Sequence, residues 1–394
     1  MTDIKRIREK MKNAVHEDAK TGLKYFSGYS YNTLYDWDQY FESLVQIHCG
    51  YDSEYIRNGV MIFLEHMEED GFIARHVPIG AGPWQREHVK PFLCQICLLV
   101  IRFYGEKEWI LNEDRMDRLE KYLRYWLGPM DQDGNGLSEW MSSPHSGMDN
   151  QHERAGYWGD FFCEGTDLNS YLTVECRAYA EMCEMFSDYE RAELFRRYAR
   201  EHAEKINRIL WKEEKSFYFD RNVRAGRNEV SKYVMPGARL NEVWKEETIG
   251  YKSAAGFMPM WAGIAGREQA EKLVTRHLLN PKEFWSEYPV TVQSADTSFG
   301  TSQPLPFDLG CCWRSNVWVP TNWMIVQGCL RYGYDIVAQA IIDKTEELVR
   351  RSGDREYYAV DGAGCGLDPF YGWTLLAYFM QEEKDSGMWK KLIV

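Results

Sequence analysis

Two carboxylates, Asp149 and Glu356, lie in segments of similar composition. Asp149 stands in the run Ser146-Gly147-Met148-Asp149-Asn150, and Glu356 begins Glu356-Tyr357-Tyr358, which precedes a glycine-rich stretch and the run Phe370-Tyr371-Gly372-Trp373-Thr374. Each acid is therefore placed beside turn-forming residues and near aromatic side chains. Two such acids on separate loops indicate general acid and general base cleavage of a glycosidic bond.

The surroundings of Asp149 decide whether it can donate a proton. If Trp140, Met148 and Trp158 lie close to it, partial burial favours the neutral carboxyl, as a general acid requires. The alternative from these few residues is an ordinary Asx turn.

Helices must carry these loops, because helical periodicity runs along the whole chain. Apolar residues recur at helical spacing in four clear segments, at 56–67, 116–126, 195–209 and 337–348. Asp114 and Asp335 are candidate N-caps, and Phe217-Tyr218-Phe219 is a strand-like exception. Similar segments along the chain suggest about twelve helices.

The chain shows no linker rich in Pro, Gly or Ser, so we predict one all-α domain over residues 1–394. A toroid of six helical hairpins, with the long loops at one mouth, satisfies this arrangement. Periodicity predicts helices but does not by itself specify a toroid.

The composition limits the class of partner. The net charge of −13 argues against nucleic acid or an anionic membrane surface, although it leaves room for a local basic pocket. Aromatic residues make up 15% of the chain, with 15 Trp and 25 Tyr. Aromatic planes stack on sugar rings, but large helical proteins also bury many aromatics.

The run Tyr35-Asp36-Trp37-Asp38 leads into a predicted helix. Asp38 is placed to accept hydrogen bonds from sugar hydroxyls, with Trp37 as a stacking wall; the alternative is a helix cap. Gln95 follows the helix-starting Lys90-Pro91 and is expected to face inward, a weak signal alone.

Trp313, Arg314 and Trp318 fall in one loop that enters a helix. Arg314 is suited to orient a carboxylate or hydroxyl, and the two tryptophans to wall a pocket. The alternative is a buried structural arginine.

Asp131-Gln132-Asp133-Gly134-Asn135-Gly136 matches the first half of a calcium loop. The acid expected at the twelfth position is replaced by Ser142, so the EF-hand pattern fails. We favour an oxygen-rich turn without a bound ion; a structural calcium completed by a distant carboxylate is the alternative. His145 and His152 lack a zinc-binding motif, and no GxSxG or phosphate-loop pattern occurs. We therefore predict no required cofactor and no catalytic metal.

The chain begins without an apolar signal segment, and no stretch approaches the roughly 18 apolar residues of a membrane helix. Cys94 and Cys97 have apolar neighbours and are interpreted as buried thiols rather than a redox or zinc pair. A reducing cytoplasm is the simplest compartment. The loop aromatics would also suit a subunit contact, so a homo-oligomer is an open alternative.

These clusters, in this order, resemble the inverting α-glycosidases of glycoside hydrolase family 63, nearest to the bacterial mannosylglycerate and glucosylglycerate hydrolase branch. The motifs that carry the resemblance are Trp37-Asp38, Gln95, 146–150, 167–172, 210–211, 217–220, 255–260, 277–281, 283–285, Trp313-Arg314, Trp318, 321–323, 356–358 and Trp373-Thr374. Each motif is weak alone, whereas the ordered set is specific.

The resemblance implies an (α/α)6 barrel with Asp149 as general acid and Glu356 as general base, about 6.5–9.5 Å apart as inversion requires. It also implies that Tyr35, Trp37, Asp38, Gln95, Asn150, Trp313, Arg314, Trp318 and Trp373 bind the sugar. His145 and Ser315-Asn316 depart from the family pattern, and these departures bear on the substrate rather than on the reaction.

Arg75, His76, Arg86 and His88 form a basic segment that would suit the leaving-group side, where cations would bind a glycerate-like carboxylate. The alternative is a solvated loop. Competing functions are a sugar epimerase or isomerase, disfavoured because the nine His show no obvious pair, and a non-catalytic carbohydrate-binding protein.

Overall fold

The computed structural model describes residues 4–28, 33–78, 86–156, 163–225, 246–297 and 312–394. The predicted neighbour Trp158 lies outside these ranges. Within them, every helix is too short or too polar to cross a lipid bilayer. The chain divides into two units, one made of 1–129, 171–201 and 369–394, the other of 130–170 and 202–368. Residues distant in sequence therefore build each unit, and the prediction of one domain stays a prediction.

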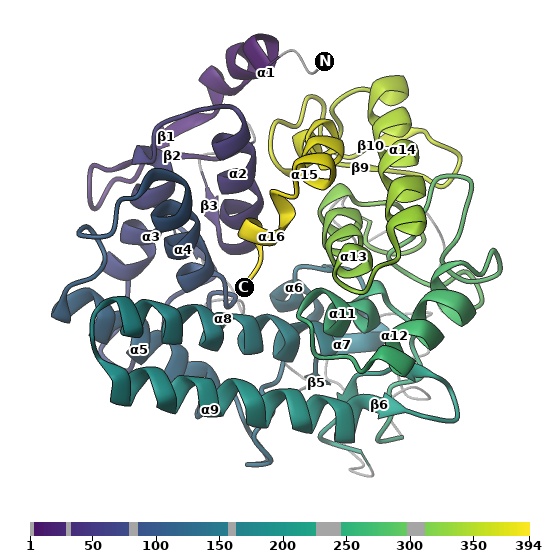
Figure 1. Ribbon diagram of the computed structural model, residues 1–394, viewed down its shortest axis with the longest axis horizontal. Coiled ribbons are helices and arrows are strands. Elements are labelled where there is room, and N and C mark those ends of the chain that lie inside the picture. The colour runs from purple at the N-terminus through teal and green to yellow at the C-terminus, as the bar shows by residue number, and fades with distance from the viewer. Residues whose placement is uncertain (1–3, 29–32, 79–85, 157–162, 226–245, 298–311) are drawn as a thin grey trace. The chain divides into compact units, whose positions relative to one another are not determined.

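The first unit is mainly helical. Its helices are α1 (Ile4–Met11), η1 (Lys12–Ala14), α2 (Asp36–His48), α3 (Glu54–Glu65), α4 (Leu93–Tyr104), α5 (Glu113–Leu127), η6 (Trp373–Tyr378), α15 (Met380–Ser386) and α16 (Trp389–Leu392). Its strands are β1 (Val15–Glu17), β2 (Lys24–Phe26), β3 (Leu34–Tyr35) and β4 (His76–Val77), paired antiparallel as β1–β2 and β3–β4. Helices α8 (Thr166–Met185) and α9 (Tyr189–Lys205) begin or end in the second unit and lie side by side (Figure 1), where Tyr179 packs on Phe195.

Helix α2 is buried from Asp36 to Gln46. Its apolar residues, including Tyr40, Phe41 and Leu44, explain this burial, because a helix with apolar residues on several faces must be enclosed. Three acids, Asp36, Asp38 and Glu42, are buried with them. Buried carboxylates require partners or protons, so α2 is built around polar contacts as well as apolar packing.

The second unit carries the loops around both proposed catalytic acids. Its helices are α6 (Ser143–Ser146), α7 (His152–Ala155), η3 (Ile206–Leu210), η4 (Ala254–Phe257), α11 (Met258–Trp261), α12 (Arg267–Lys272), η5 (Leu273–Leu278), α13 (Val319–Arg331) and α14 (Asp335–Ser352). Its two-residue strands are β5 (Cys163–Glu164), β6 (Trp211–Lys212), β7 (Phe217–Tyr218), β8 (Arg221–Asn222), β9 (Tyr357–Tyr358) and β10 (Gly364–Cys365), paired antiparallel as β5–β8, β6–β7 and β9–β10.

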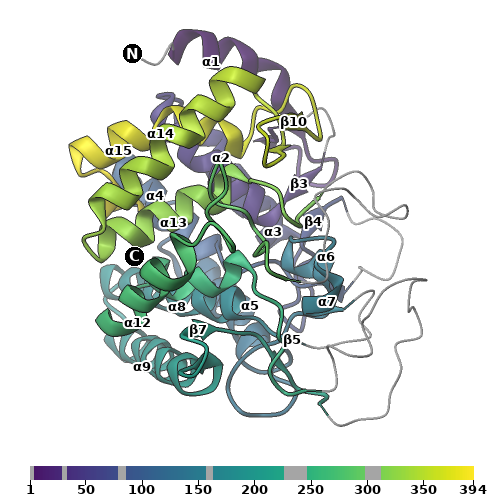
Figure 2. The same cartoon turned by 90° about the vertical axis from the view of Figure 1, so that its right-hand side faces the viewer.

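Helix α13 of the second unit packs against α11 and α14. It is buried from Val319 to Leu330. Asn322 fixes its first turn, since its side chain accepts from Val290 N (3.0 Å) and donates to Thr345 Oγ1 of α14 (2.9 Å). The short helices α6 and α7 lie next to each other (Figure 2).

Several local predictions are confirmed and others need correction. Strand β7 confirms the strand-like run at Phe217, and Cys94 and Cys97 are buried free thiols. The cap of α5 is Asn112, whose side chain accepts from Arg115 N (3.1 Å), rather than Asp114, which lies inside the first turn. Asp335 is likewise the first helical residue of α14 and not its cap, and α3 ends at Glu65, before the predicted position 67.

Candidate active site

Asp149 lies in the short loop between α6 and α7 in the second unit. Ser142 caps α6 by accepting from His145 N (3.0 Å), and α6 ends at Gly147 with φ +83°, a conformation that glycine adopts without strain. Ser143 Oγ then donates to the carbonyl oxygen of Asp149 (2.9 Å). Asp149 itself is half-buried. The backbone of the loop is thus held by hydrogen bonds around a half-buried Asp149.

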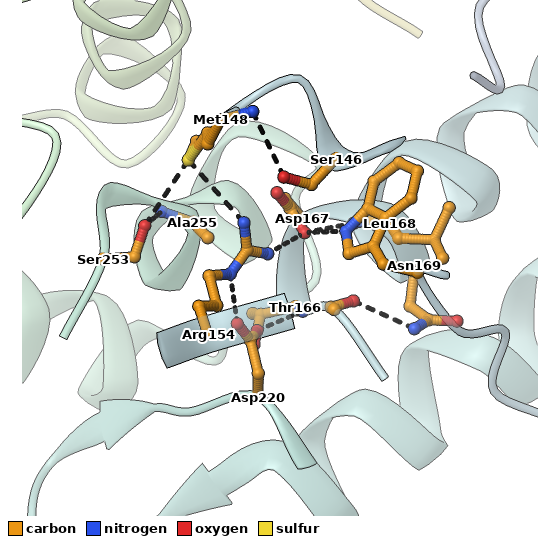
Figure 3. A network of polar contacts seen from close by, with 12 residues as sticks. Ser146, Met148, Arg154, Thr166, Asp167, Leu168, Asn169, Asp220, Ser253 and Ala255 are labelled. Atoms are coloured by element: carbon orange, nitrogen blue, oxygen red, sulfur yellow. Dashed lines mark hydrogen bonds and ion pairs between the residues drawn. The ribbon is translucent and has the colours of Figure 1, made fainter. Parts of the chain in front are cut away.

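A buried network of ion pairs and hydrogen bonds lies next to this loop (Figure 3). Arg154 is completely buried and pairs with both Asp167 and Asp220. Burial lowers its pKa, but the two acids raise it more, so the net shift is upward and the guanidinium stays charged. Its Nη1 also lies 3.6 Å from Met148 Sδ, one residue before Asp149.

The two acids of this network are held independently of Arg154. Trp140 Nε1 and Leu168 N both donate to Asp167 Oδ1, each at 2.8 Å, and Thr166 N donates to Asp220 Oδ1 (2.7 Å). All of these groups are buried, so their hydrogen bonds and ion pairs are stronger than they would be in water. The sequence did not single out Arg154, Asp167 and Asp220 as a set; the motif at 167–172 was the signal that could have led to them.

The Asp149 loop is joined to the tryptophan-rich loop by two side chains. Asn150 Oδ1 accepts from Trp313 N (2.8 Å). Gln151 Nε2 donates to Trp313 O (2.6 Å), and its Oε1 accepts from Ser253 Oγ (2.9 Å). Asn150 is therefore engaged with the protein backbone, which gives it a positioning function in the structure.

Three stacked rings connect this loop to Glu356. Trp313 stacks on Trp318 with ring centroids 3.5 Å apart, and Trp318 stacks on Tyr357 at 4.7 Å. Val317 and Tyr358 add a two-way backbone bridge, with N–O distances of 2.8 and 3.0 Å. Since both faces of the fully buried Trp318 are covered by rings, the structure indicates that it supports the site rather than contacting sugar directly.

Glu356 is half-buried and anchored at one oxygen. Its Oε2 accepts from Leu367 N (3.0 Å), and its backbone N donates to Leu367 O (3.3 Å). Gly366 has φ +68°, and a Cβ there would lie 2.4 Å from Glu356 Oε2. Only glycine therefore allows this close approach. Both proposed catalytic acids thus belong to the second unit and are connected through Trp313, Trp318 and Tyr357.

Arg314 lies beside this assembly. It is buried, with Nη1 3.2 Å from Glu153 Oε1. The predicted departures from the family pattern are also buried or half-buried: His145 packs edge-on against Trp140 at 5.0 Å, and Asn316 Nδ2 donates to Cys312 O (3.2 Å).

The first unit holds the other predicted sugar-binding residues. Trp37 meets Trp373 edge-to-face at 6.4 Å, and both are almost fully buried. Asp38 adjoins Trp37 on α2, and Tyr35 faces His76 across the β3–β4 pair with ring centroids 5.5 Å apart. Tyr35 and Trp373 thus lie near Trp37 of α2.

A buried ion pair lies against Trp37. Lys90 Nζ contacts Asp36 Oδ1 and Oδ2 at 3.1 and 3.2 Å, and its charge lies 5.3 Å from the Trp37 ring. Asp36 Oδ1 also accepts from Trp37 N (2.7 Å). The pair fixes both the backbone and the ring of Trp37. Asp36 immediately precedes the predicted Trp37-Asp38 pair in the sequence. No local sequence pattern connects Asp36 with Lys90.

Gln95 is engaged within the first unit. Its Nε2 donates to Pro91 O (2.8 Å) and to Glu175 Oε2 (3.1 Å). Burial raises the pKa of Glu175 to about 7, although it accepts from Cys94 N and Tyr122 OH. The burial of Gln95 confirms its inward orientation. Its amide forms hydrogen bonds at the start of α4 and with the side chain of Glu175.

The four basic residues of the proposed leaving-group side have different surroundings. Arg75 pairs with Glu87 (2.9 Å), and Arg86 binds two partly exposed acids at 2.6 and 3.0 Å. His88 is completely buried, and each of its ring nitrogens lies 3.2 Å from a backbone carbonyl. Burial lowers the pKa of His88 to about 3, so the expectation of a cation there is wrong. Burial also lowers the pKa of His76.

Comparison with solved structures defines the class of fold. A family 63 mannosylglycerate hydrolase of Thermus thermophilus, crystallised with glucose, superposes with a TM-score of 0.70 at 18% identity, covering 96% of this chain and 99% of that one. The neutral trehalase of Saccharomyces cerevisiae superposes at 0.63 with 20% identity, covering 96% and 78%. These likenesses confirm the predicted (α/α)6 toroid.

Sequence comparison then identifies the family. The profile of the mannosylglycerate hydrolase MGH1-like glycoside hydrolase domain matches residues 31–374, so the chain belongs to this family. A mannosylglycerate hydrolase from a strain of Thermus thermophilus is 30% identical over 171 residues, which are 43% of this chain and 34% of that protein. The matched region therefore spans about a third of that relative's length. The predicted resemblance is confirmed at the level of the family.

Proposed function

We propose that this protein is an inverting α-glycosidase that hydrolyses a small α-glucoside or α-mannoside, with Asp149 as general acid and Glu356 as general base. The observation that carries the proposal is the connection of the two acid-bearing loops within one unit through the Trp313, Trp318 and Tyr357 rings. Two acids on separate but connected loops of one unit support this chemistry, which requires carboxyls about 6.5–9.5 Å apart.

In the proposed reaction Asp149 protonates the glycosidic oxygen as the bond to the anomeric carbon breaks. Glu356 removes a proton from a water molecule that attacks that carbon from the opposite face. One water molecule is consumed, and the sugar leaves with a β-hydroxyl. At the end of the reaction Asp149 is ionised and Glu356 is protonated, and proton exchange with solvent restores both acids. The half-buried position of both acids suits this proton exchange.

We assign sugar contacts to Trp313 and Arg314 in the second unit. In the first unit, Tyr35, Trp37, Asp38 and Trp373 are proposed sugar-binding residues. Asn150, Gln95 and Trp318 act by holding neighbouring groups in place, since their polar groups or ring faces are engaged within the protein. For the leaving group, Arg75, His76 and Arg86 are the proposed contacts, whereas His88 is not. A glycerate-like aglycone is the substrate feature that the two arginines would favour, with His76 as a neutral hydrogen-bonding group.

The decisive experiment follows the released anomer by proton NMR. The purified protein is incubated with glucosylglycerate, mannosylglycerate, trehalose, kojibiose, nigerose and isomaltose. An initial β-anomer from one α-glycoside supports the proposal and identifies the substrate. An initial α-anomer would refute inversion, and conversion of a free sugar to its isomer or epimer would favour the competing enzyme class. Sugar binding without turnover by the folded protein would favour a binding protein.

We also propose a cytoplasmic location. The nine cysteines within the described ranges are free thiols, eight of them buried, which fits a reducing compartment. A homo-oligomer is an additional proposal that size-exclusion chromatography with light scattering would test.

A further inference from the structure

Glu42 is a buried acid on the same helix as two of the proposed sugar contacts. It lies one turn after Asp38 on α2 and is almost completely buried. A carboxyl at this depth requires a hydrogen-bond donor, a proton or both. The proposed reaction uses Asp149 and Glu356 only, so the contacts of Glu42 with the protein define its role.

The carboxyl of Glu42 is bonded to the backbone of Gly28. Its Oε1 accepts a hydrogen bond from Gly28 N. The carbonyl oxygen of Gly28 in turn accepts from Tyr371 N (2.7 Å). Both backbone polar groups of Gly28 are therefore engaged, one with α2 and the other with the segment at 370–373, which carries Trp373.

Two glycines allow these segments to cross at close range. A Cβ on Gly28 would overlap the backbone of Gly372 and would lie 2.7 Å from Glu42 Oε1. A Cβ on Gly372 would lie 3.1 Å from the same oxygen. Neither glycine has a positive φ, so the crossing requires space rather than an unusual backbone conformation. Glu42 Oε1 thus lies beside both glycines of the crossing.

The Gly28–Gly372 crossing leads directly to Trp373, the first residue of η6. Leu375 N donates to Gly372 O (3.1 Å) and so closes the first turn of η6. The Trp373 ring packs against Phe370 with centroids 4.7 Å apart and meets Trp37 of α2 edge-to-face at 6.4 Å. The position of Gly372 against α2 therefore determines where the two tryptophan rings meet.

The neutral form of Glu42 suits this arrangement. Burial raises its pKa well above the ordinary range, and the charge of Asp38 raises it further, whereas the bond from Gly28 N acts in the opposite direction. A neutral carboxyl keeps an acceptor oxygen for Gly28 and adds no second negative charge beside Asp38.

We propose that Glu42 is a positioning residue of the sugar-binding residues in the first unit. Its carboxyl joins α2 to the Gly28–Gly372 crossing and so places the Trp373 ring against Trp37. The inference rests on the proposed glycosidase function, because Trp37 and Trp373 are proposed sugar contacts. Positioning by this route depends on the reach of the side chain and on its acceptor oxygen, not on its charge.

Three substitutions separate reach from charge, on the α-glycoside that the anomer assay identifies. Glu42→Gln keeps the length and an acceptor oxygen and should retain the parental KM. Glu42→Asp is one methylene shorter, and Glu42→Leu has no acceptor. Each of these two should raise KM about five- to tenfold with kcat within about twofold, as expected when one aromatic contact to the sugar is misplaced.

The matched control is Glu383→Leu, which removes another buried acid of the same unit. Glu383 Oε1 lies 2.7 Å from His48 Nε2 at the far end of α2. Its loss should lower stability, because it breaks a buried contact, and should leave KM at the parental value.

The position of Trp373 is also measured without any turnover. In ¹⁹F NMR of protein labelled with 5-fluorotryptophan, Trp373→Phe identifies the Trp373 resonance. This resonance should keep its parental position in Glu42→Gln and in Glu383→Leu. It should shift or broaden in Glu42→Asp and Glu42→Leu.

The two readouts give distinct ways to overturn the inference. A parental Trp373 resonance in both Glu42→Asp and Glu42→Leu would do so whatever the activity. A parental KM in these variants, or a KM raised equally by Glu42→Gln or Glu383→Leu, would exclude the positioning role. If Glu42→Leu fails to fold, Glu42→Asp carries both measurements. A parent that neither binds nor cleaves any glycoside tested would refute the proposed function instead, and the Trp373 resonance would still decide whether Glu42 places this ring.

Discussion

Replacing Arg154 with methionine tests the network beneath the Asp149 loop. The change removes the guanidinium between Asp167 and Asp220, all three being buried. Breaking a buried ion pair costs about 3–5 kcal/mol, because the partner's charge is left uncompensated. Asp167 keeps two N–H donors and Asp220 keeps one. With these bonds remaining, the expected loss is about 4 kcal/mol for the whole network.

Urea unfolding, followed by far-ultraviolet circular dichroism and tryptophan fluorescence, measures this loss. A stability of about 5–15 kcal/mol is typical of folded proteins. If the parent lies in most of that range, a loss of about 4 kcal/mol leaves the variant folded in water. The control is Arg350→Met on α14, where an exposed pair with Glu346 contributes at most about 0.5 kcal/mol. A loss for Arg154→Met no larger than that of the control would refute the assignment of Arg154 as the buried cation of the network.

The remaining predictions concern the acids. Asp149→Asn should lower kcat about 10²–10⁴-fold while sugar binding persists, because only the proton donor is lost; near-normal turnover would disprove its role. Glu356→Gln should abolish hydrolysis similarly, and added azide should restore cleavage with an inverted azide product, whereas unchanged turnover would exclude the base. Glu175 has a folded-state pKa of about 7 against an ordinary 4.5, so the folded state binds more protons between these values. Stability should therefore fall by up to about 3 kcal/mol as pH rises from 4.5 to 7. Glu175→Gln should flatten this slope in urea titrations, and an unchanged slope would contradict the assignment.

The helices were well predicted from the sequence, because helical spacing of apolar residues is a local pattern. Helical spacing identified the segments of α3, α5 and α14 within a few residues. Asp149 lies in a loop as expected, with Ser146 as the last residue of α6. Cap positions were less accurate. Asp114 and Asn112 are both good capping residues, and only the extended backbone at Asn112 decides between them.

Local patterns could not predict contacts between distant segments. The pairing of Gln151 with Trp313 spans 162 residues and that of Arg154 with Asp220 spans 66. Trp318 was interpreted as a pocket wall because tryptophan suits both cores and binding sites; only the structure shows rings on both of its faces. His88 illustrates the same limit for charge, since burial removes the cation that its residue type suggested.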